Sequence, residues 1–133
     1  MSPERIKELL KDYKNSVARL KEALELDLTS GALVLDGTIK RFEFTFELGW
    51  KLARAILDDQ GVVVNSPRAA IKEAFRINLI QDGEGWIKML EERNKTSHIY
   101  DENQAKEIYQ QIKKFHFKLL QDLSQYSDRT KLI

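Results

Sequence analysis

Residues 39–57, IKRFEFTFELGWKLARAIL, decide the fold class. Apolar side chains recur there every three or four residues, which is the spacing of one face of an α-helix. These positions are Ile39, Phe42, Phe46, Trp50, Ala53, Ile56 and Leu57. Phe44 adds an aromatic ring outside that face, so we predict a helix that is either fully buried or packed by the core on one side and by a partner on the other. It is expected to begin near Asp36 or Thr38 and to end at residues 58–61, with Gly61 in a left-handed conformation.

Gly49 lies inside this predicted helix. A glycine there costs about 1 kcal/mol relative to alanine. Because glycine has no Cβ, a closely approaching second helix would explain its presence, and we expect such a contact.

Four further helices are predicted by the same apolar spacing and by local start signals. They span residues 3–26 (capped by Ser2), 67–79 (capped by Ser66), 86 to 95 or 97, and 101 to between 123 and 126. Asp101 and Gln104 form a capping box for the last helix, whose expected core positions are Ala105, Ile108, Ile112, Phe115, Leu119, Leu120 and Leu123. We therefore predict an all-α, antiparallel up-and-down bundle of four long helices and one short helix, as a single domain over residues 1–126 with a C-terminal tail at 127–133.

Composition excludes several classes of protein. The 133 residues carry 22 basic and 21 acidic side chains, so a broadly cationic nucleic-acid coat is excluded. The chain has no cysteine and only two histidines, so we expect neither a metal nor a cofactor. No apolar run is long enough to span a membrane, and the first residues lack the apolar core of a signal peptide, so a cytoplasmic location is expected.

Residues 91–101, EERNKTSHIYD, carry more chemistry than a connection between two helices needs. Arg93 offers a planar, permanently charged fork to phosphate oxygens. His98 can accept or donate a proton near neutral pH. On one regular helix, five residues rotate a side chain by about 140°, so these two would diverge. Either the helix ends between them, or a second subunit completes the site.

The pattern Arg93-Asn94-x3-His98-x-Tyr100 resembles the Arg-x4–6-His motif of HEPN domains. In this longer form it is similar to the HEPN proteins paired with minimal nucleotidyltransferases, also called the nucleotidyltransferase substrate-binding protein family. The resemblance extends over nearly the whole chain, including the aromatic segment 41–51 and Ser66-Pro67-Arg68 before a helix.

The resemblance implies a HEPN-like bundle that forms a homodimer and has a minimal nucleotidyltransferase, encoded nearby, as its partner. It implies the toxin half of a two-component system: a metal-independent endoribonuclease with Arg93 and His98 as catalytic residues. Arg93, Asn94, His98 and Tyr100 would contact RNA or nucleotide. Transfer of AMP to Tyr100 would regulate the activity, because a bulky anionic group beside His98 obstructs an RNA phosphate.

Structural alternatives exist for each of these residues. Arg93 could pair with Glu91, Glu92 or a neighbouring helix; His98 could be a helix-end or core histidine; and Tyr100 could be half-buried. Thr96 and Ser97 are expected to cap or end a helix, and His116, on the last predicted helix, is expected to be structural.

Two other functions stay open on the sequence. Glu84, Glu91, Glu92, Asp101 and Glu102 flank the motif and would repel RNA unless they face away from the site. The chain could therefore be a non-catalytic, nucleotide-binding subunit of a nucleotidyltransferase complex. It could also be a helical scaffold without a ligand.

Overall fold

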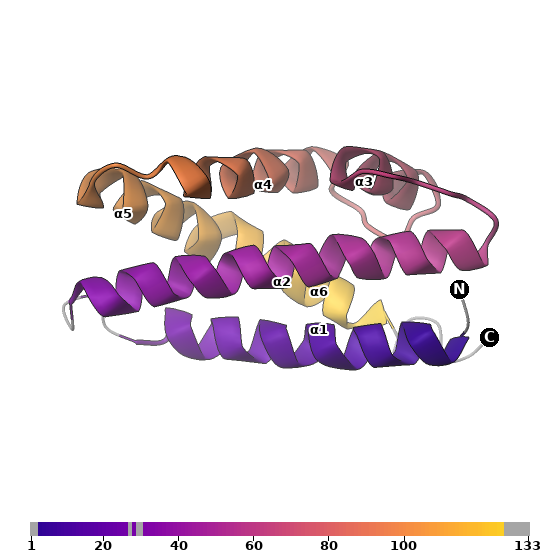
Figure 1. Cartoon of the computed structure of the whole chain (residues 1–133), viewed down its shortest axis with the longest axis horizontal. Coiled ribbons are helices and arrows are strands. Elements are labelled where there is room, and N and C mark those ends of the chain that lie inside the picture. Colours follow the sequence, from indigo (N-terminus) through magenta and orange to yellow (C-terminus); the bar gives the residue numbers. More distant parts are fainter. Residues whose placement is uncertain (1–2, 27, 29–30, 127–133) are drawn as a thin grey trace.

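The predicted all-α, up-and-down bundle is confirmed (Figure 1). The computed structural model describes residues 3–26, 28 and 31–126. Its elements are α1 (Pro3–Leu24), α2 (Ala32–Asp59), α3 (Pro67–Arg76), α4 (Gly83–Lys95), the 3₁₀ turn η2 (Thr96–His98), α5 (Glu102–Gln111), the π-helical turn η3 (Ile112–His116) and α6 (Phe117–Ser124). α5, η3 and α6 follow one another without a break and correspond to the single last helix of the prediction. The proposed cap Ser2 and the tail 127–133 lie outside the described residues.

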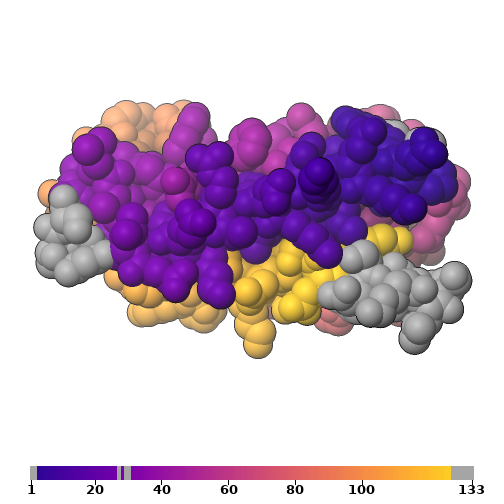
Figure 2. Space-filling view, turned by 90° about the horizontal axis from the view of Figure 1, so that it is seen from below, coloured from indigo at the N-terminus to yellow at the C-terminus, as the bar shows by residue number. Residues whose placement is uncertain are grey.

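α2 is the central helix of the bundle and contacts α1, α3, α4, α5 and α6. Figure 2 shows α1 lying across one face of the molecule with α6 beside it. The inner face of α2 is buried at Ile39, Phe42, Phe46, Trp50, Ala53, Ile56 and Leu57, as the apolar spacing predicts. Phe44, by contrast, is 62% exposed, so α2 is not buried all round.

The close contact expected at Gly49 is made by Tyr13 of α1. A Cβ at Gly49 would lie 3.0 Å from Cε1 of the Tyr13 ring. The Tyr13 ring is fully buried, and its hydroxyl donates a hydrogen bond of 2.5 Å to the carbonyl oxygen of Leu120 in α6. Burial raises the pKa of the Tyr13 phenol well above its usual range, and the nearby Asp122 carboxylate adds to this shift.

α2 begins one turn earlier than predicted, at Ala32 instead of Asp36 or Thr38. Leu35 is buried and extends the apolar face back by one turn. The Thr38 hydroxyl does not cap the helix; it donates to the carbonyl oxygen of Val34 within α2. The predicted end is correct, because Gly61 has a φ of 82° and lies just after the C-cap.

Three other helix ends also differ from the prediction. α1 ends at Leu24, two residues early. α3 ends at Arg76 because Asn78 adopts a left-handed φ of 63°, and the N–H of Leu79 closes the turn on the carbonyl oxygen of Ala74. α4 begins at Gly83, three residues before the predicted start at residue 86, because Asp82 is its N-cap and accepts a hydrogen bond from the N–H of Gly85.

The π-helical turn η3 was not predicted, and it changes which residues of the last helical segment face the core. Phe115, an expected core residue, is 57% exposed, while His116 is buried. A π turn holds one more residue than an α turn, which rotates the following residues around the axis. The inner face therefore continues from Ile112 to His116 and Leu120.

None of the described helices combines the length and apolarity that crossing a membrane would require.

The contact between Tyr13 and Gly49 can be tested by adding one methyl group. We expect Gly49→Ala to lower the free energy of unfolding by about 1–2 kcal/mol, because overpacking against an anchored ring outweighs the gain in helix propensity. The matched control is Gly37→Ala, also in α2, where an added Cβ meets nothing within 4 Å. It should stabilise the protein by about 0.5–1 kcal/mol. Urea unfolding measures both, and equal effects of the two substitutions would contradict the proposed contact.

Candidate functional site

The polar motif spans the end of α4, the turn η2 and the start of α5. The Thr96 hydroxyl donates to the carbonyl oxygen of Arg93 at 2.6 Å, and the Ser97 hydroxyl donates to that of Asn94 at 3.3 Å. These bonds satisfy carbonyl groups of the last helical turn. Thr96 and Ser97 thus end the helix, as expected. Because α4 stops at Lys95, the helix ends between Arg93 and His98, which is one of the two predicted alternatives.

Arg93 lies on the face of α4 that packs against α2. Its Nη1 donates to Oε2 of Glu47 at 3.3 Å, and its guanidinium carbon lies 5.2 Å from the centroid of the Phe46 ring. The Arg93 side chain is 26% exposed. The alternative of an ion pair with a neighbouring helix is therefore realised, through Glu47 and not through Glu91 or Glu92.

His98 and Tyr100 both lie at the surface. Tyr100 is 82% exposed, which excludes the half-buried alternative, and His98 is not a core histidine. The predicted capping box is present: Asp101 accepts a hydrogen bond from the N–H of Gln104 at 2.8 Å. The Gln104 amide oxygen accepts from the N–H of Tyr100 at 2.7 Å, one residue before the cap. The phenol of Tyr100 therefore projects from a hydrogen-bonded backbone.

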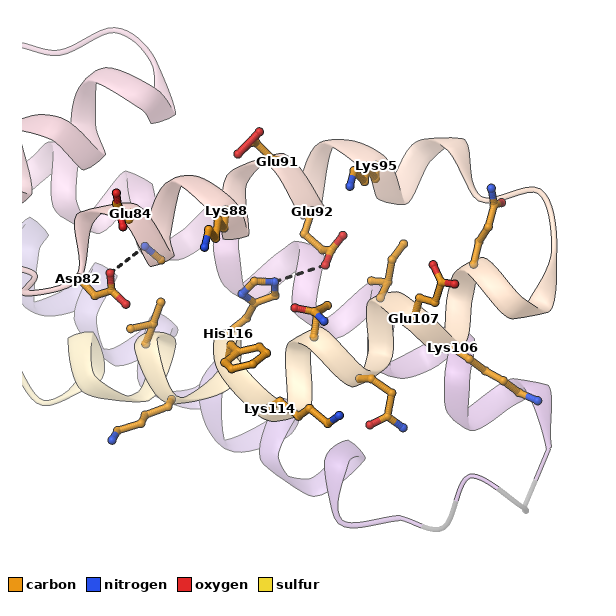
Figure 3. Close-up of a pocket in the computed structure, with 18 of the residues that line it drawn as sticks. Asp82, Glu84, Lys88, Glu91, Glu92, Lys95, Lys106, Glu107, Lys114 and His116 are labelled. Atoms are coloured by element: carbon orange, nitrogen blue, oxygen red, sulfur yellow. Dashed lines mark hydrogen bonds and ion pairs between the residues drawn. The ribbon is translucent and has the colours of Figure 1, made fainter.

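An open groove of about 1360 Å³ runs between α4 and the α5–η3–α6 segment (Figure 3). His98 lines this groove, whereas Arg93, Asn94 and Tyr100 are not among its lining residues. Of these four motif residues, His98 is thus the one that lines this groove.

The groove carries charges of both signs. Its lysines are Lys88, Lys95, Lys106, Lys114 and Lys118, and its carboxylates are Asp82, Glu84, Glu91, Glu92, Glu107 and Asp122. Three of the acidic residues that flank the motif, Glu84, Glu91 and Glu92, therefore line the groove and do not face away from it. The lysines could not be recognised as a group from the sequence, because they come from two helical segments that meet only in the fold. Lys88 and Lys95 are seven residues apart, a spacing that puts both on one face of a helix, and this was the signal in the sequence for the α4 side of the groove.

His116 occupies the floor of the groove on the π turn η3. Its ring is 4% exposed and stacks on Phe42 with centroids 5.7 Å apart. Its Nε2 lies 3.6 Å from Oε1 of Glu92 on α4 (Figure 3). This packing agrees with the structural role expected for His116. In the described part of the chain, no three potential ligands among His, Cys, Asp and Glu lie close enough to hold a metal ion.

The sequence from residue 8 to residue 129 matches the family described as nucleotidyltransferase substrate binding protein like. The chain belongs to this family. The family that the Arg-x4-His-x-Tyr motif resembles is thereby confirmed. A curated relative from Haemophilus influenzae, named probable ribonuclease HepT, is 33% identical over 87 residues, which are 62% of this chain and 60% of the length of that protein.

Two solved structures have the same fold as this chain. A crystal structure of a protein from Thermus thermophilus has a TM-score of 0.76 and 29% identity, and the match covers 84% of this chain and 94% of that one. A Haemophilus influenzae structure has a TM-score of 0.65 and 23% identity, with 93% of this chain and 97% of that one covered. The latter is described as revealing the fold of a substrate binding domain of a nucleotidyltransferase, and at this identity the likeness concerns the fold alone.

The two histidines should respond differently to substitution. We expect His116→Ala to lower the free energy of unfolding by about 2–4 kcal/mol, because it leaves a cavity against Phe42. His98→Ala should change it by less than about 0.5 kcal/mol, because the side chain is exposed. Thermal and urea unfolding measure both, and a large loss of stability in His98→Ala would contradict the surface placement of this residue.

Proposed function

We propose that this chain is the HEPN-type partner of a minimal nucleotidyltransferase encoded nearby, and that it cleaves RNA without a metal ion. The observation that carries this proposal is the exposed imidazole of His98, positioned just past the end of α4 in a chain of this family. The name of the Haemophilus influenzae relative, probable ribonuclease HepT, supports the same activity.

The proposed cleavage uses His98 as general base and Arg93 as phosphate ligand. His98 removes the proton of a ribose 2′-OH, and the resulting oxygen attacks the adjacent phosphorus. A 2′-O–P bond forms while the P–O5′ bond breaks, and the leaving oxygen takes up a proton, which gives a 2′,3′-cyclic phosphate and a 5′-OH. The guanidinium of Arg93 stabilises the negative charge that develops on the phosphoryl oxygens, and Asn94, which is exposed beside it, offers a further hydrogen bond.

A second copy of the chain completes the site in this proposal. Arg93 faces α2, whereas His98 lines the groove between α4 and α5, so within one chain the two side chains lie on different faces. In a twofold dimer, the motif of one protomer can face that of its partner across one cleft. The homodimer is thus part of the proposed function.

Cleavage by His98 can be tested with the purified protein and a single-stranded RNA. We expect His98→Ala to lower the cleavage rate by a factor of about 100 or more, the contribution typical of general acid–base catalysis. Arg93→Ala should have an effect at least as large. Glu73→Ala is the control, because it changes an ion pair with Arg76 on α3, away from the motif, and should cleave like the wild type.

A second function is favoured by the carboxylates in the groove. Six carboxylates against five lysines give little attraction for a long polyanion such as RNA. A mononucleotide needs fewer phosphate contacts, so the alternative is a non-catalytic nucleotide-binding subunit of the nucleotidyltransferase complex. A wild-type protein that binds nucleotide and leaves RNA intact would decide for this alternative.

The proposed RNA cleavage would be regulated through modification of Tyr100. In the proposed step, the Tyr100 phenolic oxygen attacks the α-phosphorus of ATP in the active site of the partner nucleotidyltransferase. An O–Pα bond forms, the bond between Pα and the oxygen that bridges to Pβ breaks, pyrophosphate leaves with that oxygen, and the phenolic proton passes to a base. The 82% exposure of Tyr100 gives a second protein the access that this transfer needs. Because the reaction consumes ATP, the pair would operate in the cytoplasm.

Mass spectrometry tests this transfer after incubation with the neighbouring nucleotidyltransferase and ATP. We expect one AMP group on the peptide that contains Tyr100, none in Tyr100→Phe, and a loss of RNA cleavage that parallels the modification. The substituted tyrosine is exposed, so folding should be unaffected. An unmodified Tyr100, with a partner shown to be active on another acceptor, would contradict the proposed regulation.

A further inference from the structure

The guanidinium of Arg93 is anchored at one atom. Nη1 donates to Oε2 of Glu47, and the guanidinium carbon lies over the Phe46 ring, 5.2 Å from its centroid. Nε is buried and, among the described residues, has no hydrogen-bond partner. Among the described residues, Glu47 therefore directs the guanidinium through a hydrogen bond, while the Phe46 ring packs against it.

Glu47 is itself held from both sides. Its Oε1 lies 3.5 Å from Nζ of Lys51, one turn later on α2, and its Oε2 accepts from Arg93. The Glu47 side chain is 35% exposed and that of Arg93 is 26% exposed, so water reaches the pair only in part. The three charges sum to one positive charge, since Lys51 offsets the carboxylate. An incoming anion thus still meets a cationic site.

We propose that Glu47 is a positioning residue for Arg93. It fixes the guanidinium against Phe46 and leaves the edge away from Glu47 for a phosphate group of the ligand. An oriented donor stabilises developing charge without having to reorganise during the reaction, which is how such a contact raises a rate. This inference rests on the proposed role of Arg93 as phosphate ligand and adds a residue from α2 to the site.

Positioning and simple electrostatics predict opposite results. If Glu47 acted only through its charge, removing it would raise the positive potential at Arg93, and RNA would bind more tightly with no loss of turnover. If Glu47 orients Arg93, its removal lowers kcat while KM stays the same or falls. The neutral acceptor in Glu47→Gln can still bond to Nη1, although more weakly than a carboxylate does. Positioning therefore predicts partial rescue by glutamine, whereas a pure charge effect makes Gln and Ala equivalent.

The experiment compares Glu47→Ala and Glu47→Gln with the wild type in steady-state RNA cleavage. We expect kcat to fall about tenfold or more in Glu47→Ala and by a smaller factor in Glu47→Gln, with KM unchanged or lower. Glu73→Ala is the matched control, because it breaks an ion pair with Arg76 on α3, at 2.7 Å, far from the motif in sequence. It should leave both constants unchanged. Wild-type kcat in Glu47→Ala would overturn the inference.

A second measurement does not depend on cleavage. The Nε–H signal of Arg93 in a ¹⁵N-labelled protein, identified by its loss in Arg93→Ala, reports how firmly the side chain is held. We expect its hydrogen exchange to accelerate about tenfold in Glu47→Ala and less in Glu47→Gln, because the buried Nε–H becomes mobile. An unchanged exchange rate would overturn the positioning role. If RNA stays intact in the wild type, the proposed ribonuclease function fails, and this exchange rate alone decides on Glu47.

Discussion

The phenol of Tyr13 lies where three helices meet. Its ring occupies the space that a side chain at Gly49 of α2 would fill, and its hydroxyl donates to the carbonyl oxygen of Leu120 in α6. A buried hydroxyl without a partner would cost about 1–3 kcal/mol, so this bond and the missing Cβ act together. They set the rotation of α2 relative to α1 and α6. Phe46 and Glu47 lie within one turn of Gly49, so the same constraint places the residues that contact Arg93.

One face of α4 packs into the core, and another face lines the groove. One face packs Trp86, Met89 and Leu90 into the core and continues to Arg93. The other face, with residues such as Lys88 and Lys95, forms a wall of the groove. Arg93 therefore belongs to the core-facing side of α4, whereas His98, three residues after Lys95, lies on the side of the groove. The motif thus places Arg93 against α2 and His98 in the groove, although the two residues are only five positions apart.

Much of the fold could be predicted because it depends on local rules. The apolar face of α2, the Ser66 cap, the left-handed Gly61 and the Asp101 capping box all follow from short-range geometry. The π turn at Ile112–His116 could not be predicted in this way. Its residues fit a regular helix, and the additional residue is favoured only by what surrounds it: the pocket against Phe42 accepts the His116 ring and leaves Phe115 at the surface.

For the candidate site too, local features could be predicted from the sequence and long-range contacts could not. The sequence by itself determined a helical bundle, the family and the residue types able to bind phosphate and move a proton, because spacing and side-chain chemistry are local properties. Only the tertiary structure decided that Arg93 pairs with Glu47, that Tyr100 is exposed, and that lysines from two helical segments line a groove with His98. Those facts depend on which helix faces lie against each other. That arrangement comes from long-range packing, which fixes contacts between residues that are far apart in the chain.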